Sequence, residues 1–207
     1  MRGRLITIEG LDGAGKTTLA RALADALRAR GVPLTALREP GGVAAAERIR
    51  TLVKDPALHV GARAEALLYA AARAQLVEEA LEPALARGEW VLLDRFVDSS
   101  LAYQGGGRGL GVEAVREVNA FATGGLTPDR TLLLRVDPAL GRARQQGRGE
   151  AADRLEREAD GFFAAIDAAY AQLTSEEPER VRPIDASVAP AEVLSAALAA
   201  LADLLPG

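Results

Sequence analysis

The stretch that decides the fold is Leu5-Ile-Thr-Ile-Glu-Gly-Leu-Asp-Gly-Ala-Gly-Lys-Thr17, close to the start of the chain. Its first part, Leu5–Glu9, is short, apolar and β-branched, which favours a buried strand. Its second part has the spacing Gly-x-x-x-x-Gly-Lys-Thr, and a helix-favouring segment follows at about 16–30. In such a loop the backbone N–H groups surround phosphate oxygens, the lysine reaches the outer phosphates and the threonine hydroxyl binds Mg²⁺. The sequence therefore predicts a site for a nucleoside triphosphate with Mg²⁺.

Outward from this stretch, apolar runs alternate with segments rich in Ala, Leu, Glu and Arg, which favour helix. The predicted strands are Leu5–Glu9, Pro33–Leu37, Trp90–Asp94, Thr131–Val136 and Arg180–Ile184. The predicted helices cover about 16–30, 43–53, 62–87, 112–122, 153–173 and 190–204. This alternation predicts an α/β fold of three layers, with a five-stranded parallel sheet covered by helices on both faces. Ligands of such sheets bind beyond the carboxyl ends of the strands, where the glycine-rich stretches 10–15, 41–42 and 105–111 are expected as loops.

Composition narrows the classes of function. A length of 207 residues predicts a single domain, 1–207, and the lack of cysteine excludes disulfides, thiolate metal sites and thiol nucleophiles. The chain has one histidine, His59, which is expected to lie in a loop. A single histidine excludes metal sites built from several histidines. A net charge of -4 argues against a nucleic-acid partner, and no apolar run reaches the ~18 residues of a membrane span. Without a signal peptide at the amino terminus, the expected location is cytoplasmic.

The basic residues point to one position in particular. Of the 25 basic residues only Lys16 and Lys54 are lysine, so that arginine is used at the other 23 positions. A chain that prefers arginine so strongly keeps lysine at position 16, where a compact point charge on a flexible stem suits an outer phosphate.

Two motifs of other nucleotide-binding classes are missing. The chain has neither the Asn-Lys-x-Asp motif of guanine-reading GTPases nor the Leu-Ser-Gly-Gly-Gln signature of transporter ATPases. A small kinase or a nucleotide-driven switch remains.

At the end of the predicted strand 90–94, Asp94 is placed to organise Mg²⁺ and Arg95 to hold an acceptor phosphate. Arg38 follows the second strand and suits the same phosphate, while Asp98 and Ser99 are expected to cap the next helix.

Four motifs together resemble the thymidylate kinase family. They are Ile8-Glu-Gly-Leu-Asp-Gly-Ala-Gly-Lys-Thr-Thr18, Arg38-Glu-Pro-Gly-Gly42, the stretch from Asp94-Arg-Phe to Arg108, and Asp153-Arg-Leu-Glu156. They occur in that family's order over most of the chain. The resemblance implies transfer of the γ-phosphoryl group of ATP to dTMP, giving dTDP and ADP, with Mg²⁺. It also implies a homodimer and a P-loop kinase core with a mobile lid, which falls at about 142–158.

The resemblance also implies roles for individual residues. Tyr69 and Arg73 are four apart on one helix face, a spacing that by itself is more often a surface or core pair. The family assigns them to the thymine ring, by stacking and by a hydrogen bond. The dTMP site it implies comprises Asp12, Arg38, Glu39, Tyr69, Arg73, Arg95, Ser100, Tyr103 and Gln104. The ATP site comprises Gly10, Leu11, Asp12, Gly13, Ala14, Gly15, Lys16, Thr17, Thr18, Arg142 and Arg144. Mg²⁺ is assigned to Thr17 and Asp94.

Catalysis needs positive charge around the transferring phosphoryl group. The phosphate loop contains no arginine between positions 11 and 14, so the lid is expected to supply one. Arg148 is the first choice, with Arg142, Arg144 and Arg154 as alternatives, and Asp12, Lys16 and Arg95 complete the predicted catalytic set. Two other functions remain open: a deoxynucleoside kinase, with Glu39 as its base, and a nucleotide switch without an acceptor.

Overall fold

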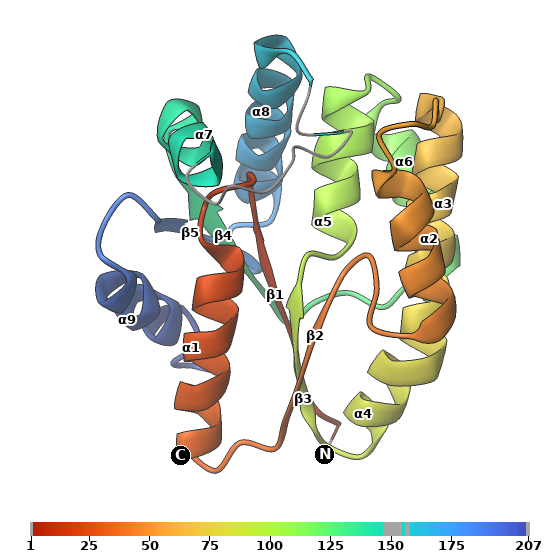
Figure 1. The fold of residues 1–207 in the computed structure, drawn as a ribbon. Coiled ribbons are helices and arrows are strands. Elements are labelled where there is room, and N and C mark those ends of the chain that lie inside the picture. The colour runs from red at the N-terminus through yellow and green to blue at the C-terminus, as the bar shows by residue number, and fades with distance from the viewer. Residues whose placement is uncertain (1, 147–154, 156–157, 206–207) are drawn as a thin grey trace.

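The computed structural model describes residues 2–146, 155 and 158–205. Five strands form one parallel sheet in the order β2-β3-β1-β4-β5 (Figure 1). The strands are β1 (Leu5–Gly10), β2 (Leu34–Arg38), β3 (Trp90–Asp94), β4 (Arg130–Arg135) and β5 (Val181–Asp185). Each lies within one residue of a predicted run, so the predicted five-stranded parallel sheet is confirmed.

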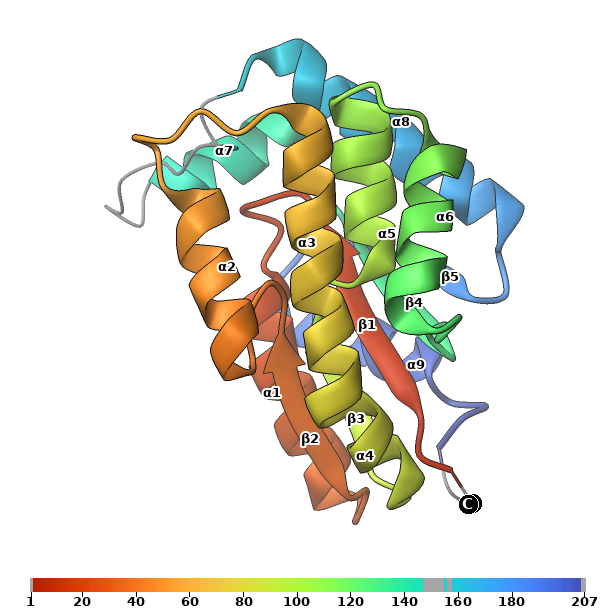
Figure 2. The same cartoon turned by 90° about the vertical axis from the view of Figure 1, so that its right-hand side faces the viewer.

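Helices cover both faces of this sheet (Figures 1 and 2). One face carries α1 (Lys16–Ala29) and α9 (Pro190–Ala200), which pack on each other. The other elements are α2 (Ala44–Lys54), α3 (Ala62–Leu76), the π-helical turn η1 (Val77–Leu81), α4 (Glu82–Ala86), α5 (Val97–Ser100), the π-helix η2 (Leu101–Gly107), α6 (Val112–Thr123), α7 (Pro138–Gln146) and α8 (Asp160–Glu176). Of these, η2 packs against both α6 and α8, and α3 lies between α2 and α6.

Strand β1 shows how the sequence forms this sandwich. All six of its residues are buried, because the strand is central and covered on both faces. Ile6 and Ile8 point into the core that α1 and α9 cover, while Leu5 belongs to the core under α4 and η1. In α1, the leucines Leu19, Leu23 and Leu27 recur every fourth residue and form the buried stripe that faces the sheet.

The structure corrects three sequence-based expectations about elements. Residues 97–107 are helical, so Gly105–Gly107 belong to η2 and only 108–111 form a loop. Helix α7 runs to Gln146, so the first part of the predicted lid at 142–158 is helix. The last long helix before β5 begins at Asp160 and ends at Glu176, later than the predicted 153–173.

The expected capping role of Asp98 and Ser99 is also wrong. Helix α5 begins at Val97, so both residues lie inside its first turn. The buried Asp98 carboxylate instead accepts hydrogen bonds from Arg180, at 2.6 and 3.0 Å, and from the Thr131 hydroxyl at 2.9 Å. Asp98 therefore joins α5 to the sheet.

None of the helices in the described part of the chain has both the length and the apolar character that a bilayer span requires.

Candidate functional site

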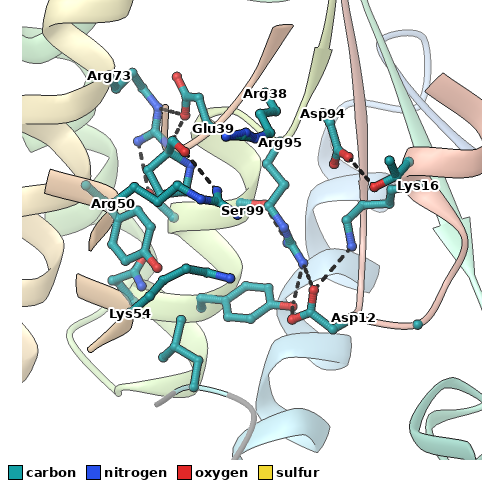
Figure 3. A pocket seen from close by; sticks show the side chains of 18 of the residues that line it. Asp12, Lys16, Arg38, Glu39, Arg50, Lys54, Arg73, Asp94, Arg95 and Ser99 are labelled. Carbon is teal, nitrogen blue, oxygen red and sulfur yellow. Dashed lines mark hydrogen bonds and ion pairs between the residues drawn. The ribbon is translucent and has the colours of Figure 1, made fainter. Parts of the chain in front are cut away.

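A cleft opens at the carboxyl ends of β1, β2 and β3, where a parallel sheet of this kind is expected to bind ligands (Figure 3). The loop after β1, the ends of β2 and β3, and the helices α2, α3, α5 and η2 all contribute side chains. The lining residues include Asp12, Gly13, Gly15, Lys16, Thr17, Arg38, Glu39, Pro40, Arg50, Lys54, Tyr69, Arg73, Asp94, Arg95, Ser99, Ser100, Tyr103, Gln104 and Leu155. Segments far apart in sequence thus meet in one place.

The phosphate loop follows β1 and leads directly into α1, as predicted. Gly15 caps α1 with a φ of 93°, a left-handed conformation that glycine adopts without strain. Gly13 has a φ of 80°, and a Cβ there would lie 2.0 Å from the carbonyl oxygen of Gly141 in α7. The side chain of Ala14 is buried in the core under α1 and α9, and that of Leu11 in the core between η2 and α8, so only the backbone of these residues is available to a phosphate. Thr18 is exposed and does not line the cleft.

Lys16 lies over this loop. Its ammonium donates hydrogen bonds to the carbonyl oxygens of Gly10 at 3.1 Å and Leu11 at 2.9 Å, and lies 3.6 Å from the Asp12 carboxylate. Burial, together with the neighbouring positive charge of Arg95, lowers the pKa of Lys16 to about 8. The group is thus a mostly protonated, poorly hydrated cation at neutral pH, well suited to exchange carbonyl partners for phosphate oxygens.

The two predicted metal ligands are brought together. The Thr17 hydroxyl donates a hydrogen bond of 3.0 Å to Asp94 Oδ2, across the gap between α1 and the end of β3. Among the residues that the structure describes, no three acidic or histidine side chains gather into a cluster that would hold a metal alone. Hydroxyl and carboxylate oxygens are hard ligands that fit Mg²⁺, which takes its remaining ligands from water and substrate phosphates.

Asp12, Arg95 and Tyr103 form a compact polar group between the phosphate loop and the end of β3 (Figure 3). Arg95 Nη2 donates to Asp12 Oδ1 at 2.6 Å, and the Tyr103 hydroxyl donates to Asp12 Oδ2 at 3.2 Å. Burial alone would raise the pKa of Asp12, yet Arg95 and Lys16 outweigh it and hold this pKa well below its usual range. Asp12 is therefore ionised. The Arg95 guanidinium also lies 4.9 Å from the centre of the Tyr103 ring, in a cation–π contact.

The backbone of Arg95 adopts a strained conformation. Its φ of 74° lies in the left-handed region. Among the described residues other than glycine, Arg95 alone has a positive φ. Such a conformation costs about 1–3 kcal/mol and persists only where the surroundings enforce it. The consequence is that the Arg95 side chain turns from the end of β3 toward the phosphate loop.

The buried Arg73 is surrounded by protein acceptors. Its Nε donates to Glu39 at 2.8 Å, Nη1 donates to Ser100 at 2.9 Å and also to Asn119, and Nη2 donates to the carbonyl oxygen of Phe96 at 2.9 Å. A second contact, between Nη2 and Glu39, measures 2.7 Å. Four of the five N–H groups thus donate to protein acceptors, and Nη2 also lies against Glu39 as an ion pair. Burial raises the pKa of Glu39 to about 7 against the opposing effect of Arg73.

The other residues assigned to dTMP also line the cleft, though with their own partners. The Gln104 amide donates a hydrogen bond of 2.9 Å to Glu65, a carboxylate with no exposed surface that also receives Arg108. Arg38 reaches Glu47 of α2 at 3.1 Å. Tyr69 and Ser100 line the cleft beside Arg73. The structure therefore brings all nine residues of the predicted acceptor site into one cleft.

Sequence reasoning missed Arg50 and Lys54, which line the same cleft (Figure 3). They stand four apart on α2, and Arg50 Nη1 donates to the carbonyl oxygen of Pro40 at 2.8 Å. The rarity of lysine is a signal that could have found Lys54, because both lysines of the chain line this cleft. Arg50 is one of 23 arginines, and the sequence carries no comparable signal for it.

Of the four predicted lid arginines, the structure describes the side chain of Arg144 only. Arg148 and Arg154 lie outside the described residues, as does the side chain of Arg142. Arg144 lies in α7 and donates a hydrogen bond of 2.8 Å to the carbonyl oxygen of Ala186, just after β5. Arg144 is not among the residues that line the cleft, so the structure does not bring it to the phosphate loop.

Comparisons with known proteins agree on one family. The family model described as thymidylate kinase matches residues 8–197. The thymidylate kinase of Halorhodospira halophila is 49% identical over 99% of this chain and 96% of its own. That of Deinococcus radiodurans is 50% identical over 90% of both chains. The crystal structure of thymidylate kinase from Ehrlichia chaffeensis superposes with a TM-score of 0.80 at 26% identity, covering 98% of this chain and 99% of the other. This chain belongs to the thymidylate kinase family.

Proposed function

We propose that this protein transfers the γ-phosphoryl group of ATP to dTMP, giving dTDP and ADP. The observation that carries the proposal is the Asp12–Arg95 pair, which joins the phosphate loop to the end of β3 inside one cleft. A donor phosphate chain on the loop and an acceptor phosphate on Arg95 then face each other. The described lining of the cleft contains six basic side chains against three acidic ones, in a chain whose net charge is -4. This excess of positive charge suits two anionic substrates.

On the donor side, the backbone N–H groups of the loop and the N-terminus of α1 bind the phosphates of ATP. Lys16 moves its ammonium from the carbonyl oxygens of Gly10 and Leu11 to the outer phosphates. Thr17 and Asp94 would hold Mg²⁺, which supplies charge neutralisation on the phosphate oxygens when bound.

On the acceptor side, Arg95 and Arg38 hold the phosphate of dTMP in line with the γ-phosphoryl group, and Asp12 orients Arg95. Tyr103 packs against the deoxyribose. Tyr69, Arg73, Ser100, Gln104 and Glu39 surround the thymine. The acceptor phosphate is already a nucleophilic anion. Its oxygen forms the new bond to the γ-phosphorus while the bond to the β-phosphate oxygen of ADP breaks, so no general base is needed.

The arginine that contacts the transferring phosphoryl group is proposed to be Arg148, which lies outside the described residues. Support comes from the phosphate loop, where the described side chains between Leu11 and Ala14 include no arginine. The charge of the transition state then needs another cation, and the sequence between α7 and α8 contains the arginines that the family resemblance assigns to this role.

The experiment that tests the function measures ADP release from Mg-ATP with a panel of acceptors. The panel contains dTMP, dUMP, the other nucleoside monophosphates and thymidine. Rapid turnover with dTMP and none with thymidine is expected. Turnover with thymidine would favour a deoxynucleoside kinase, and slow hydrolysis that ignores every acceptor would favour a nucleotide switch.

We also propose that two copies associate through the face formed by α3 and α6, which contact each other. Phe121 of α6 is 92% exposed and Leu67 of α3 is 59% exposed. Ala64 and Ala71 extend the exposed stripe of α3 on either side of Leu67. A second copy of the chain is the partner that the family relationship favours.

We further propose a cytoplasmic location, where ATP is available as the phosphoryl donor.

A further inference from the structure

Glu9 is a buried carboxylate that the proposed reaction does not use. It is the last residue but one of β1, has no exposed surface, and does not line the cleft. A buried carboxylate is costly unless its oxygens are hydrogen-bonded, and this one accepts three bonds. The donors are the backbone N–H of Phe96 at 2.7 Å, the Ser99 hydroxyl at 2.5 Å and the Tyr170 hydroxyl at 3.0 Å.

One of these bonds, together with a backbone bond to Ile8, holds the backbone around Arg95. The N–H of Arg95 donates to the carbonyl oxygen of Ile8 at 3.0 Å, and the N–H of Phe96 donates to Glu9. The peptide units before and after Arg95 are thus both anchored to the end of β1. This double anchoring accounts for the left-handed φ of 74°, which a non-glycine residue does not adopt without such support.

A second path runs through a side chain. The Ser99 hydroxyl donates to Glu9 Oε2 and accepts a hydrogen bond of 2.9 Å from Arg95 Nη1. Because a hydroxyl has one proton, the bond to Glu9 leaves only the lone pairs of Ser99 facing Arg95. One end of the guanidinium is thereby held at Ser99, and its other nitrogen, Nη2, points at Asp12 (Figure 3).

We propose that Glu9 is the positioning residue of Arg95: through the Phe96 N–H and the Ser99 hydroxyl, it fixes the guanidinium where an acceptor phosphate binds. The inference rests on the proposed function, in which Arg95 holds the phosphate of dTMP. It assigns to β1 a second task beside the phosphate loop, because the same strand end sets the position of both phosphate-binding groups.

The test measures the dissociation constants of dTMP and of ATP by calorimetry, together with thermal unfolding, for the wild type, Glu9→Gln, Ser99→Ala and the double variant. Glu9→Gln is expected to weaken dTMP binding by about tenfold, and Ser99→Ala by about threefold. ATP binding is expected to change by less than about twofold, since the phosphate loop is not involved. The double variant should bind dTMP no more weakly than Glu9→Gln alone, because the loss of Glu9 already interrupts the path through Ser99.

The matched control is Thr7→Val, two residues earlier on the same face of β1. Thr7 is equally buried, and its hydroxyl pairs with that of Thr131 at 2.8 Å, away from Arg95. Thr7→Val should lower the melting temperature without weakening dTMP binding. Variants of Glu9 and Ser99 that lose stability but bind dTMP like the wild type would overturn the inference and leave Glu9 as a structural carboxylate. Failure of the wild type itself to bind dTMP would instead contradict the proposed function.

Discussion

Lys16 is a buried charge that the phosphate loop itself holds in position. Its ammonium is buried and bonded to two carbonyl oxygens of its own loop, so replacing it removes charge without disturbing another element. Lys16→Ala is expected to keep the fold and lower kcat by about 100-fold or more, because a transition-state interaction is lost. Steady-state kinetics and thermal unfolding measure both effects. A folded variant with near wild-type turnover would contradict this role.

Tyr103 is expected to set the choice of sugar. Its ring is buried under the Arg95 guanidinium, and a ring against C2′ leaves a 2′-hydroxyl without a partner, at about 1–3 kcal/mol. The wild type should therefore prefer dTMP to ribothymidine monophosphate by at least about tenfold in kcat/KM. Tyr103→Ala should narrow this ratio. Tyr103→Phe keeps the ring and loses only the hydroxyl, with its bonds to Asp12 and Arg95, so it should preserve the ratio. Equal ratios in all three proteins would place the discrimination elsewhere.

Glu39 is expected to make the free energy of unfolding depend on pH. Burial raises its pKa from the ordinary 4.5 to about 7, so between these values the folded state keeps a proton that the unfolded chain has released. The stabilisation is fully present below about pH 4.5 and is lost as pH rises through about 7, by up to about 3 kcal/mol. Urea unfolding at pH 5 and pH 8 should show this fall in the wild type and a smaller one in Glu39→Gln. An identical fall in both proteins would show that Glu39 is not its source.

At the scale of elements, the short helix α5 is held to the sheet by Asp98. Asp98 is buried against Arg180 of the loop before β5 and Thr131 of β4. Asp98→Ala leaves a largely buried guanidinium without this partner, and a loss of about 3 kcal/mol in unfolding free energy is expected. Urea denaturation measures it. Glu179→Ala is the control, because its pair with Arg182 is exposed and its removal should produce no measurable change.

The helix at 97–107 also shows why sequence patterns fall short. Glycine has a poor intrinsic preference for helix, so Gly105–Gly107 were expected as a loop. In the structure, a Cβ on Gly106 would lie 2.9 Å from that of Ala169, and one on Gly107 would lie 2.6 Å from the Phe162 ring. Glycine is thus required for the close approach of η2 to α8. That requirement comes from a tertiary contact, which no local pattern contains.

The same distinction separates the predicted from the missed parts of the site. The phosphate loop and the strand end at Asp94 and Arg95 were predictable, because their signals are contiguous and the sheet places strand ends together. The hydrogen-bond partners of the other side chains in the cleft were not predictable. Arg73 meets Asn119 of α6, and Gln104 meets Glu65 of α3, across separations of 46 and 39 residues.

For the whole molecule, the proposed association through α3 and α6 gives a direct prediction. Phe121→Glu places a charge where a second copy would bury the ring, and should shift the protein from dimer to monomer at micromolar concentration. Sedimentation velocity measures the shift. Val188→Glu, at an exposed apolar position in the loop between β5 and α9, should leave it a dimer. A wild type that sediments as a monomer would contradict the proposal.

The strand order also bears on how the chain is made. Strand β1 lies in the middle of the sheet, between β3 and β4, although it is synthesised before the other four strands of this sheet. Its partners pair Leu5 with Val91 and Ile6 with Arg130, so one side of β1 lacks a neighbour until most of the chain has been translated. Such long-range pairing slows folding and leaves an apolar strand uncovered in the nascent chain. The central position that buries β1 on both faces therefore leaves this strand in need of protection until its later partners have been synthesised.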